Sequence, residues 1–521
     1  MINQNKNSFY LPGITIVATL GGLLFGYDTA VISGTVGSLR TFFVDPLSLP
    51  LDQANAFEGF IVSSALIGCV IGASIAGFIS QRFGRKPSLI FAAVLFLFSA
   101  IGSAWPEIFF GMAGSGGHEF GNLFVIYRIL GGIGVGIASM VSPMYIAEIS
   151  PYKKRGALVS WNQFAIIFGM LVVYFVNYSI ALKGDAQWLN TFGWRWMFAS
   201  EIIPASLFLF LLIFVPETPR WLLMNNKSEK ASKILTKLVG KDESVLEMRD
   251  IQDSFNMDIR QTLRPYYIFM ITWISLFVAA LITLKYIGNT NAFEISLIGS
   301  FVVALIPPIN YFGLKIIMVG VLLSAFQQFV GINVVLYYAP EIFKSMGSGT
   351  DTALLQTIIV GVINLSFTVL AIQTVDRFGR KPLLIIGALV MTLSMTGLGT
   401  GFAAGWSGGI KLFFMLSYTA GFAMSWGPVC WVMLSEIFPN SIRSTVMSIA
   451  VAAQWVSNFL VSWTFPMMNK NEFLVNHFNQ GFSYWVYGIM GILAALFIWK
   501  LVPETKDKTL ENMNKLWDKI G

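Results

Sequence analysis

Charged residues are scarce in this 521-residue chain. Asp, Glu, Lys and Arg make up 12% of it, whereas 55% of the residues are hydrophobic and the mean hydropathy is +0.69. So little polar surface cannot cover a globule in water, which excludes most soluble folds. Cysteine is scarce too: Cys69 and Cys430 both lie in apolar stretches. They provide neither a disulfide framework nor a metal-ligand spacing, and we expect them to be packing residues.

Motifs of enzymes and of ATP-driven pumps are missing as well. The chain has no nucleophile elbow, Walker motif or HExxH motif, and its two histidines, His118 and His477, form no ligand pair by spacing. A glycine run, GGIGVG at 131–136, resembles a phosphate-binding loop. It lies inside an apolar segment without a preceding strand, so we interpret it as a site of close helix packing. The sequence therefore favours neither an enzyme nor a protein with a cofactor or metal.

Long apolar stretches are what the chain has in abundance. A helix needs about 20 apolar residues to cross a hydrocarbon core about 30 Å thick. The stretches are apolar on nearly every side, unlike the alternating strands of a membrane barrel, so the predicted fold is an all-α membrane protein. The predicted spans are 12–33, 60–80, 88–105, 123–147, 158–182 and 197–215 in the first half, and 316–338, 353–373, 383–403, 411–435, 444–466 and 481–501 in the second.

Lys and Arg concentrate in every second loop. Examples are the loops with Arg85, Lys154, Arg380 and Arg443, and the segment 220–264. By the positive-inside rule these loops face the cytoplasm, which places both termini there. The net charge of +7 is then explained by topology rather than by a nucleic-acid-binding surface, because the basic residues alternate with spans and form no single stripe.

Three motifs occur twice. RFGRKP at 82–87 recurs at 377–382, EISPYKKR at 148–155 has the counterpart EIFPNSIR at 436–443, and PET at 216–218 recurs at 503–505. Their similar offsets indicate a six-helix unit used twice, with a substrate site between the repeats near the membrane midplane. We therefore predict two pseudo-symmetric six-helix bundles, at 1–219 and 313–502, and a cytoplasmic tail at 503–521.

The segment between the two bundles has two parts. Residues 220–264 are rich in Lys and Glu and are predicted to form short cytoplasmic helices. An apolar insertion follows at 265–312, in which 266–284 is long enough to span and 295–309 is marginal. A single crossing would invert the second bundle, against the loop charges. We expect either an extra apolar hairpin or a peripheral membrane-associated pair.

Charges of the repeated motifs are candidates for a clamp at the cytoplasmic helix ends. Basic side chains would face carboxylates there and lock one conformation. The alternative is that they only set topology in solvent, where an exposed pair contributes about 0–1 kcal/mol. Their repetition in both halves favours the clamp. The predicted members are Arg82, Arg85, Glu148, Arg155, Glu217, Asp376, Arg377, Arg380, Glu436, Arg443 and Glu504.

Asp28 and Arg128 are charged residues that lie well inside apolar predicted spans. Each costs about 2.5–3.5 kcal/mol at the membrane centre, so both should face the interior and pair with each other. Separation of such a pair raises the pKa of the carboxylate, which can then bind a proton. A static ion pair is the alternative, and the intramembrane position favours proton coupling. Glu201 is a further candidate, near a helix end where a partner or water could satisfy it.

Amide side chains also fall within the predicted spans. They offer the donors and acceptors that suit a neutral polyhydroxyl ligand. Trp431 and Phe25 could stack on the apolar face of a sugar ring. Single amides also join helices, at about 0.6 kcal/mol per bond, but a group of them favours a ligand site. The candidates are Gln163, Gln327, Gln328, Asn333, Asn364 and Gln454.

The chain resembles the sugar porter branch of the major facilitator superfamily, and within it the bacterial D-xylose:proton symporters. The resemblance rests on FGYDTAVISGTV, YRILGGIGVGIASM, QQFVGINVVLYYAPEIF, VDRFGRKP and MSWGPVCWVMLSEIFPN, among other stretches that cover nearly all of the chain except about 225–315. It implies a twelve-helix alternating-access importer of a monosaccharide, D-xylose foremost, with a proton. It also implies a monomer in the lipid bilayer of the bacterial inner membrane.

The resemblance also implies roles for individual residues. It assigns proton coupling to Asp28 with Arg128, and implicates Glu201. Sugar contacts match Gln163, Gln327, Gln328, Asn333, Trp431 and Gln454, with Tyr337 close by. A facilitative sugar uniporter and a non-transporting sugar sensor are the alternatives, and a drug exporter of the same fold is a weaker one.

Overall fold

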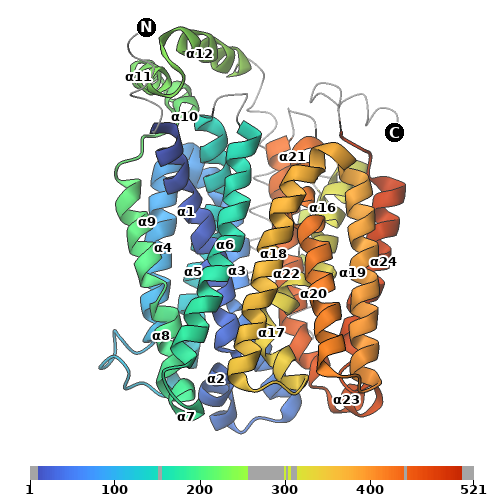
Figure 1. Cartoon of the computed structure of the whole chain (residues 1–521). Coiled ribbons are helices and arrows are strands. Elements are labelled where there is room, and N and C mark those ends of the chain that lie inside the picture. Colours follow the sequence, from blue (N-terminus) through green and yellow to red (C-terminus); the bar gives the residue numbers. More distant parts are fainter. Residues whose placement is uncertain are drawn as a thin grey trace.

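The computed structural model describes residues 10–150, 155–255, 299–300, 303–306, 314–438 and 443–506. Within these residues all regular structure is helical, and a helix occurs at each of the twelve predicted spans. Ten helical segments of the described part are long and apolar enough to cross a membrane. Figure 1 shows the helices standing side by side as two bundles.

The two bundles are called here the N half and the C half. The N half comprises α1 (Tyr10–Val31), α3 (Leu51–Phe83), α4 (Arg85–Ala104), α5 (Gly121–Ile149), α6 (Arg155–Ala181), α8 (Trp194–Ala199) and α9 (Ile202–Leu212). The C half comprises α16 (Leu314–Phe329), α17 (Ile332–Ser345), α18 (Thr350–Phe378), α19 (Arg380–Ala403), α20 (Gly408–Met424), α21 (Trp426–Glu436), α22 (Arg443–Asn469) and α24 (Phe482–Leu501).

Three helices follow the N half and cover one end of it: α10 (Pro219–Met224), α11 (Ser228–Val239) and α12 (Lys241–Phe255) (Figure 1). The Thr218 hydroxyl accepts a hydrogen bond from the Trp221 backbone N–H and caps α10. Ala231 of α11 packs against Trp221 and its neighbours. The end with these helices and with the loops 82–87 and 377–382 is called here the basic end. Most of the apolar insertion predicted at 265–312 lies outside the described residues.

Shorter helices lie at the opposite end of the bundles in Figure 1, among them α2 (Val36–Leu39), α7 (Ala186–Trp188) and α23 (Glu472–Phe478). Two irregular turns extend α1 toward this end, η1 (Ile32–Gly34) and the π-helical η2 (Arg40–Val44).

Glycines bring α3 and α5 into backbone contact. A Cβ atom on Gly132 would lie 1.8 Å from the carbonyl oxygen of Ala65, and one on Gly136 would lie 2.3 Å from that of Cys69. Only glycine permits this approach, which is how membrane helices commonly pack. The interpretation of GGIGVG as a packing site is confirmed.

Several spans are broken in the interior. Between α16 and α17, Gly331 has a φ of +94°, and a Cβ atom there would also lie 2.7 Å from the Tyr487 ring. The hydroxyl of Tyr418 donates a hydrogen bond to the carbonyl of Val330 at this break (2.8 Å). The α20–α21 break falls at Ser425 and the α8–α9 break at 200–201. Such breaks expose backbone polar groups inside the protein, where transporters build their sites.

Candidate functional site

The centre of the N half contains a buried ion pair. Asp28, near the end of α1, is 0% exposed, and Arg128 of α5 is 1% exposed. The Nη1 atom of Arg128 lies 2.7 Å from Oδ1 of Asp28, and Nη2 donates to the Asp28 backbone carbonyl at 3.1 Å. The guanidinium also lies over the ring of Phe198, 5.3 Å from its centroid. Arg128 therefore holds both the side chain and the backbone of Asp28.

This ion pair is incompletely satisfied. Oδ2 of Asp28 and Nε of Arg128 are buried and have no hydrogen-bond partner among the described residues. A bidentate pair would occupy both carboxylate oxygens, whereas this one leaves an oxygen available. Broken buried pairs are costly, so the pair should persist until a proton or a new partner compensates for the charge.

Glu201 adds a second carboxylate to the same centre. It lies at the break between α8 and α9 and is 0% exposed. Within the described part of the chain no donor group bonds to either of its carboxylate oxygens, and the Asp28 side chain is its close neighbour. Asp28 and Arg128 lie within electrostatic range. Two carboxylates and one guanidinium thus lie in one buried centre, and one proton would balance their charge.

The C half presents amides at its broken helices. Gln327 and Gln328 lie in the last turn of α16, and Asn333 lies in the first turn of α17. Nε2 of Gln327 donates to the carbonyls of Trp426 (2.9 Å) and Gly427 (3.4 Å), where α21 begins. This leaves its Oε1, which is buried without a described partner, as a free acceptor. Nδ2 of Asn333 donates to Oε1 of Gln328.

The remaining predicted contacts come from other helices. Gln454 of α22 is buried, and its Oε1 also has no hydrogen-bond partner among the described residues. Gln163 of α6 and Trp431 of α21 are half-buried, and Asn364 of α18 is buried. The hydroxyl of Tyr337 accepts a hydrogen bond from Nδ2 of Asn458 (3.4 Å).

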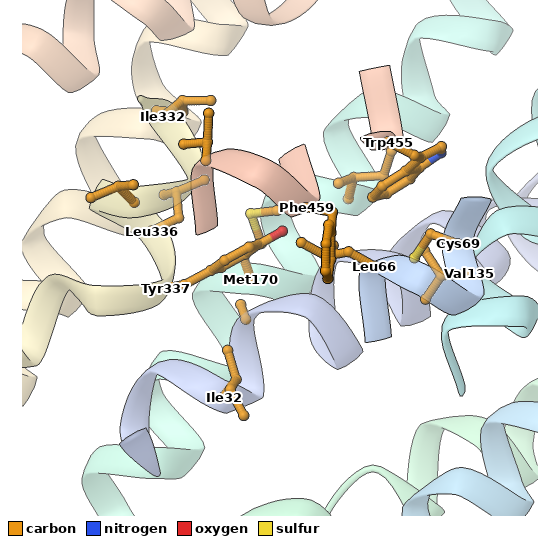
Figure 2. Close-up of a cluster of buried hydrophobic side chains, with 14 of the residues drawn as sticks. Ile32, Leu66, Cys69, Val135, Met170, Ile332, Leu336, Tyr337, Trp455 and Phe459 are labelled. Atoms are coloured by element: carbon orange, nitrogen blue, oxygen red, sulfur yellow. The ribbon is translucent and has the colours of Figure 1, made fainter. Parts of the chain in front are cut away.

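Tyr337 is a residue of the C half that lies near the charge centre. It belongs to α17 of the C half, yet it lies within electrostatic range of Asp28 and Arg128 in the N half. Figure 2 shows its hydroxyl among Met170, Leu66 and Phe459, where side chains of the two halves meet.

Phe25, a candidate for stacking on the sugar ring, packs against another aromatic ring. Its ring packs on Trp455 of α22, with centroids 5.4 Å apart, so it too joins the two halves. Sequence reasoning missed Trp455, whose indole Nε1 is buried without a described partner. Its position directly after Gln454 was the available signal.

The basic end carries the same cluster in both halves. Glu217 accepts hydrogen bonds from the backbone N–H groups of Arg85 and Lys86 (3.1 Å each) at the start of α4. Glu504 accepts them from Arg380 (3.1 Å) and Lys381 (2.9 Å) at the start of α19. Each carboxylate thus caps a helix N-terminus, where negative charge is favoured.

The N-half cluster has further contacts. Arg85 forms an ion pair with Glu148 (2.8 Å), whose other oxygen accepts from the Thr218 hydroxyl (2.6 Å). Arg82 and Arg377 are exposed. The side chains of Arg155, Asp376, Glu436 and Arg443 lie outside the described set. The contacts named here join helix ends of one half.

The two equivalent carboxylates differ in pKa. Burial raises the pKa of Glu217, although three backbone N–H groups oppose this. Burial acts in the same direction on Glu504, but hydrogen bonds from the backbone N–H groups of four residues outweigh it and lower its pKa. The repeat thus conserves the cap geometry, while the surroundings make the two carboxylates titrate differently.

The opposite end carries bonds between the halves. Nζ of Lys470, just after α22, lies 2.6 and 2.7 Å from the two carboxylate oxygens of Glu58 in α3. The indole Nε1 of Trp463 donates to the carbonyl of Ala56 (3.0 Å). Sequence reasoning missed these contacts, because Glu58 precedes the span predicted at 60–80.

Comparisons with known proteins match nearly the whole chain to sugar transporters. A family model described as Sugar (and other) transporter matches residues 14–286 and 304–517. The D-xylose-proton symporter of Escherichia coli (strain K12) is 56% identical, over 99% of this chain and 98% of that protein. A glucose facilitated diffusion protein of Zymomonas mobilis is 40% identical, over 97% of each. The inward-open structure of the xylose transporter XylE from E. coli has a TM-score of 0.80 at 54% identity, over 98% of this chain and 100% of that one.

Proposed function

Because the chain belongs to the sugar transporter family, with the major facilitator fold, we propose that it imports a monosaccharide, D-xylose, together with a proton by alternating access. The observation that carries this proposal is the charge centre beside the interface between the halves. Arg128 pairs with Asp28 there, and a second buried carboxylate, Glu201, lies within electrostatic range of both. A facilitator needs no such group, whereas a symporter needs a site whose charge changes with one proton.

The orientation follows from the charge of the loops. The basic end faces the cytoplasm of a bacterial cell, with the chain in the inner membrane and both termini inside. Bonds between the halves lie at the outer end, while the named clusters of the basic end each join helices of one half. This supports an inward-facing state, as does the likeness to the inward-open XylE structure. A single chain contains both halves of the site, which supports a monomer.

The proton site is the charge centre of Asp28, Arg128 and Glu201. A proton on either carboxylate cancels the excess negative charge. A proton on Asp28 also weakens the hold of Arg128 on Asp28, whose carboxylate and backbone carbonyl the guanidinium contacts. α1 can then shift relative to α5. The protonated carrier moves between its two states more readily, because no unpaired charge has to be buried during the change.

The sugar site lies between the halves. The free acceptors on Gln327 and Gln454 accept hydrogen bonds from hydroxyls of the sugar, while Gln163, Gln328 and Asn333 supply further donors and acceptors. Trp431 covers an apolar face of the ring. A set of neutral amides suits an uncharged substrate that must be released again, and Tyr337 of the C half lies within electrostatic range of the charge centre.

Replacing Asp28 with Asn tests the proposal. Proteoliposomes with Asp28→Asn should fail to accumulate labelled xylose against its gradient, because the proton-binding carboxylate is gone, while exchange of labelled for unlabelled xylose persists. The matched control is Asp52→Asn, the same change at an exposed position at the start of α3, which should accumulate xylose like the wild type. Accumulation by Asp28→Asn at the wild-type level would refute the coupling role.

Facilitated diffusion is the second candidate, favoured by the relative that is named a glucose facilitated diffusion protein. It predicts that steady-state xylose uptake is insensitive to an uncoupler. Symport predicts that the uncoupler reduces uptake to equilibration with the outside. Counterflow with a panel of labelled pentoses and hexoses identifies the preferred sugar.

A further inference from the structure

Glu58 is a buried carboxylate between two cations from different halves. Its side chain is 3% exposed, and both of its oxygens contact Nζ of Lys470 in the C half. The guanidinium of Arg40, from η2 of the N half, contacts the same carboxylate through Nη1. The Arg40 and Lys470 side chains are partly exposed, at 23% and 32%. One charge-assisted cluster therefore spans the interface.

Asn55 reinforces this cluster from both sides. Its Oδ1 accepts a hydrogen bond from Nη1 of Arg40 (3.1 Å), and its Nδ2 donates to the backbone carbonyl of Lys470 (3.5 Å). Asn55 and Glu58 lie about one turn apart on α3 and therefore share a face. Two side chains of one helix face thus hold the same residue of the other half.

The helix backbones meet next to the cluster. A Cβ atom on Gly59 would lie 2.4 Å from the carbonyl oxygen of Trp463, and the Trp463 indole donates to the carbonyl of Ala56. This contact shields Glu58 from water. If the outer end opens, α3 and α22 separate and Glu58 loses Lys470.

A second buried ion pair of the N half provides a contrast. Arg195 and Glu107 lie 3.2 Å apart and are almost fully buried, and Arg195 also donates to the carbonyls of Ala104 and Gly116. All of these residues belong to the N half, so this pair can stay intact when the two halves move. The Glu58 cluster is different because its bonds to Lys470 exist only when the outer end is closed.

We propose that Glu58, Arg40 and Lys470 form an ionic latch that holds the outer end closed and sets how readily the empty carrier turns outward. This latch rests on the proposed function, which places the basic end inside the cell and the Glu58 cluster at the outer end. In the inward-facing state, the latch offsets the charge of Glu58 with two cations. In the outward-facing state, Lys470 leaves, and water replaces it.

Hydrogen–deuterium exchange in nanodiscs, without sugar or a proton gradient, tests the latch. Glu58→Gln leaves Arg40 and Lys470 facing each other without the carboxylate, and Lys470→Gln removes the cation of the C half. Each variant should raise exchange at 51–60 and 463–469 by about tenfold or more, because removing one partner of a buried pair is strongly unfavourable. Exchange in the double variant should be only slightly faster than in either single variant, because both substitutions remove the same interaction.

Asp45→Asn is the matched control. Asp45 also pairs with Arg40 (3.4 Å), but it is 51% exposed and belongs to the same half, so its loss should leave exchange at wild-type rates. Wild-type exchange in both single variants, equal effects of Asp45→Asn and Glu58→Gln, or additive effects in the double variant would each overturn the latch. Xylose uptake by the wild type reports on the proposed function separately.

Discussion

Replacing Tyr418 with Phe tests how the break in the α16–α17 span supports the proposed sugar site. Tyr418 is 0% exposed, and its hydroxyl donates to the carbonyl of Val330, next to Gly331. On either side of this break lie Gln328 and Asn333, which bond to each other. The Tyr418 hydroxyl therefore fixes the turn on which the candidate amides are mounted, and we expect its loss to disorder them.

The magnitude follows from the buried carbonyl. Removing the hydroxyl leaves the Val330 carbonyl without this donor, at a cost of about 1–3 kcal/mol for a buried unsatisfied group. If the whole cost falls on the sugar-loaded geometry, xylose affinity weakens by about 5- to 150-fold. A smaller loss is expected where the chain relaxes in both the empty and the loaded state, so a tenfold loss, or about 1.4 kcal/mol, is the central expectation.

Xylose binding and counterflow provide the assay. Tyr418→Phe should raise the Kd and the counterflow KM while changing the maximal rate less, because the charge centre is untouched. The control is Tyr487→Phe: the Tyr487 ring packs on the same Gly331, but its hydroxyl has no hydrogen-bond partner among the described residues. Wild-type affinity in Tyr418→Phe, or an equal loss in Tyr487→Phe, would refute the reasoning.

Three further predictions concern other parts of the fold. Gly132→Ala should lower the thermal unfolding temperature in detergent by several degrees more than Gly134→Ala, because a Cβ atom would meet backbone at 1.8 Å in the first case and 3.1 Å in the second. On acidification from pH 7, Glu217 should bind its proton before Glu504, because the pKa of Glu217 is raised and that of Glu504 is lowered. Infrared titration of the wild type beside Glu217→Gln and Glu504→Gln checks this order. The stabilisation from Glu504 should therefore be lost only as the pH falls through its lowered pKa, whereas that from Glu217 should diminish as the pH rises through its raised pKa. Gln327→Glu should weaken xylose counterflow more than Gln327→Ala, because a carboxylate would face two carbonyl oxygens.

The sequence predicts the parts of this fold that depend on local composition. Apolar length locates the helices, and the repeated PET motif corresponds to two carboxylates with the same backbone bonds, Glu217 and Glu504. Asp28 and Arg128 stand out because a charge inside a span is costly and has few available partners. Their roles in transport, like those of the amides, stay predictions.

The contacts between the halves could not be predicted in this way. Glu58 and Lys470 are 412 residues apart. Both flank apolar stretches, where a charged residue carries no cost of burial in the membrane and therefore does not stand out in the sequence. The direction of the Gln327 amide depends on carbonyls of a distant helix break, which no local pattern records. The state of the carrier is likewise a property of packing between the halves.

Proton movement caused by the sugar is the most direct test of proton-coupled import. Proteoliposomes with an internal pH indicator and no imposed gradient receive xylose on the outside. The wild type should acidify the interior as xylose enters, and Asp28→Asn should not, while both exchange labelled xylose. Xylose entry into wild-type vesicles without any change of internal pH would contradict the account.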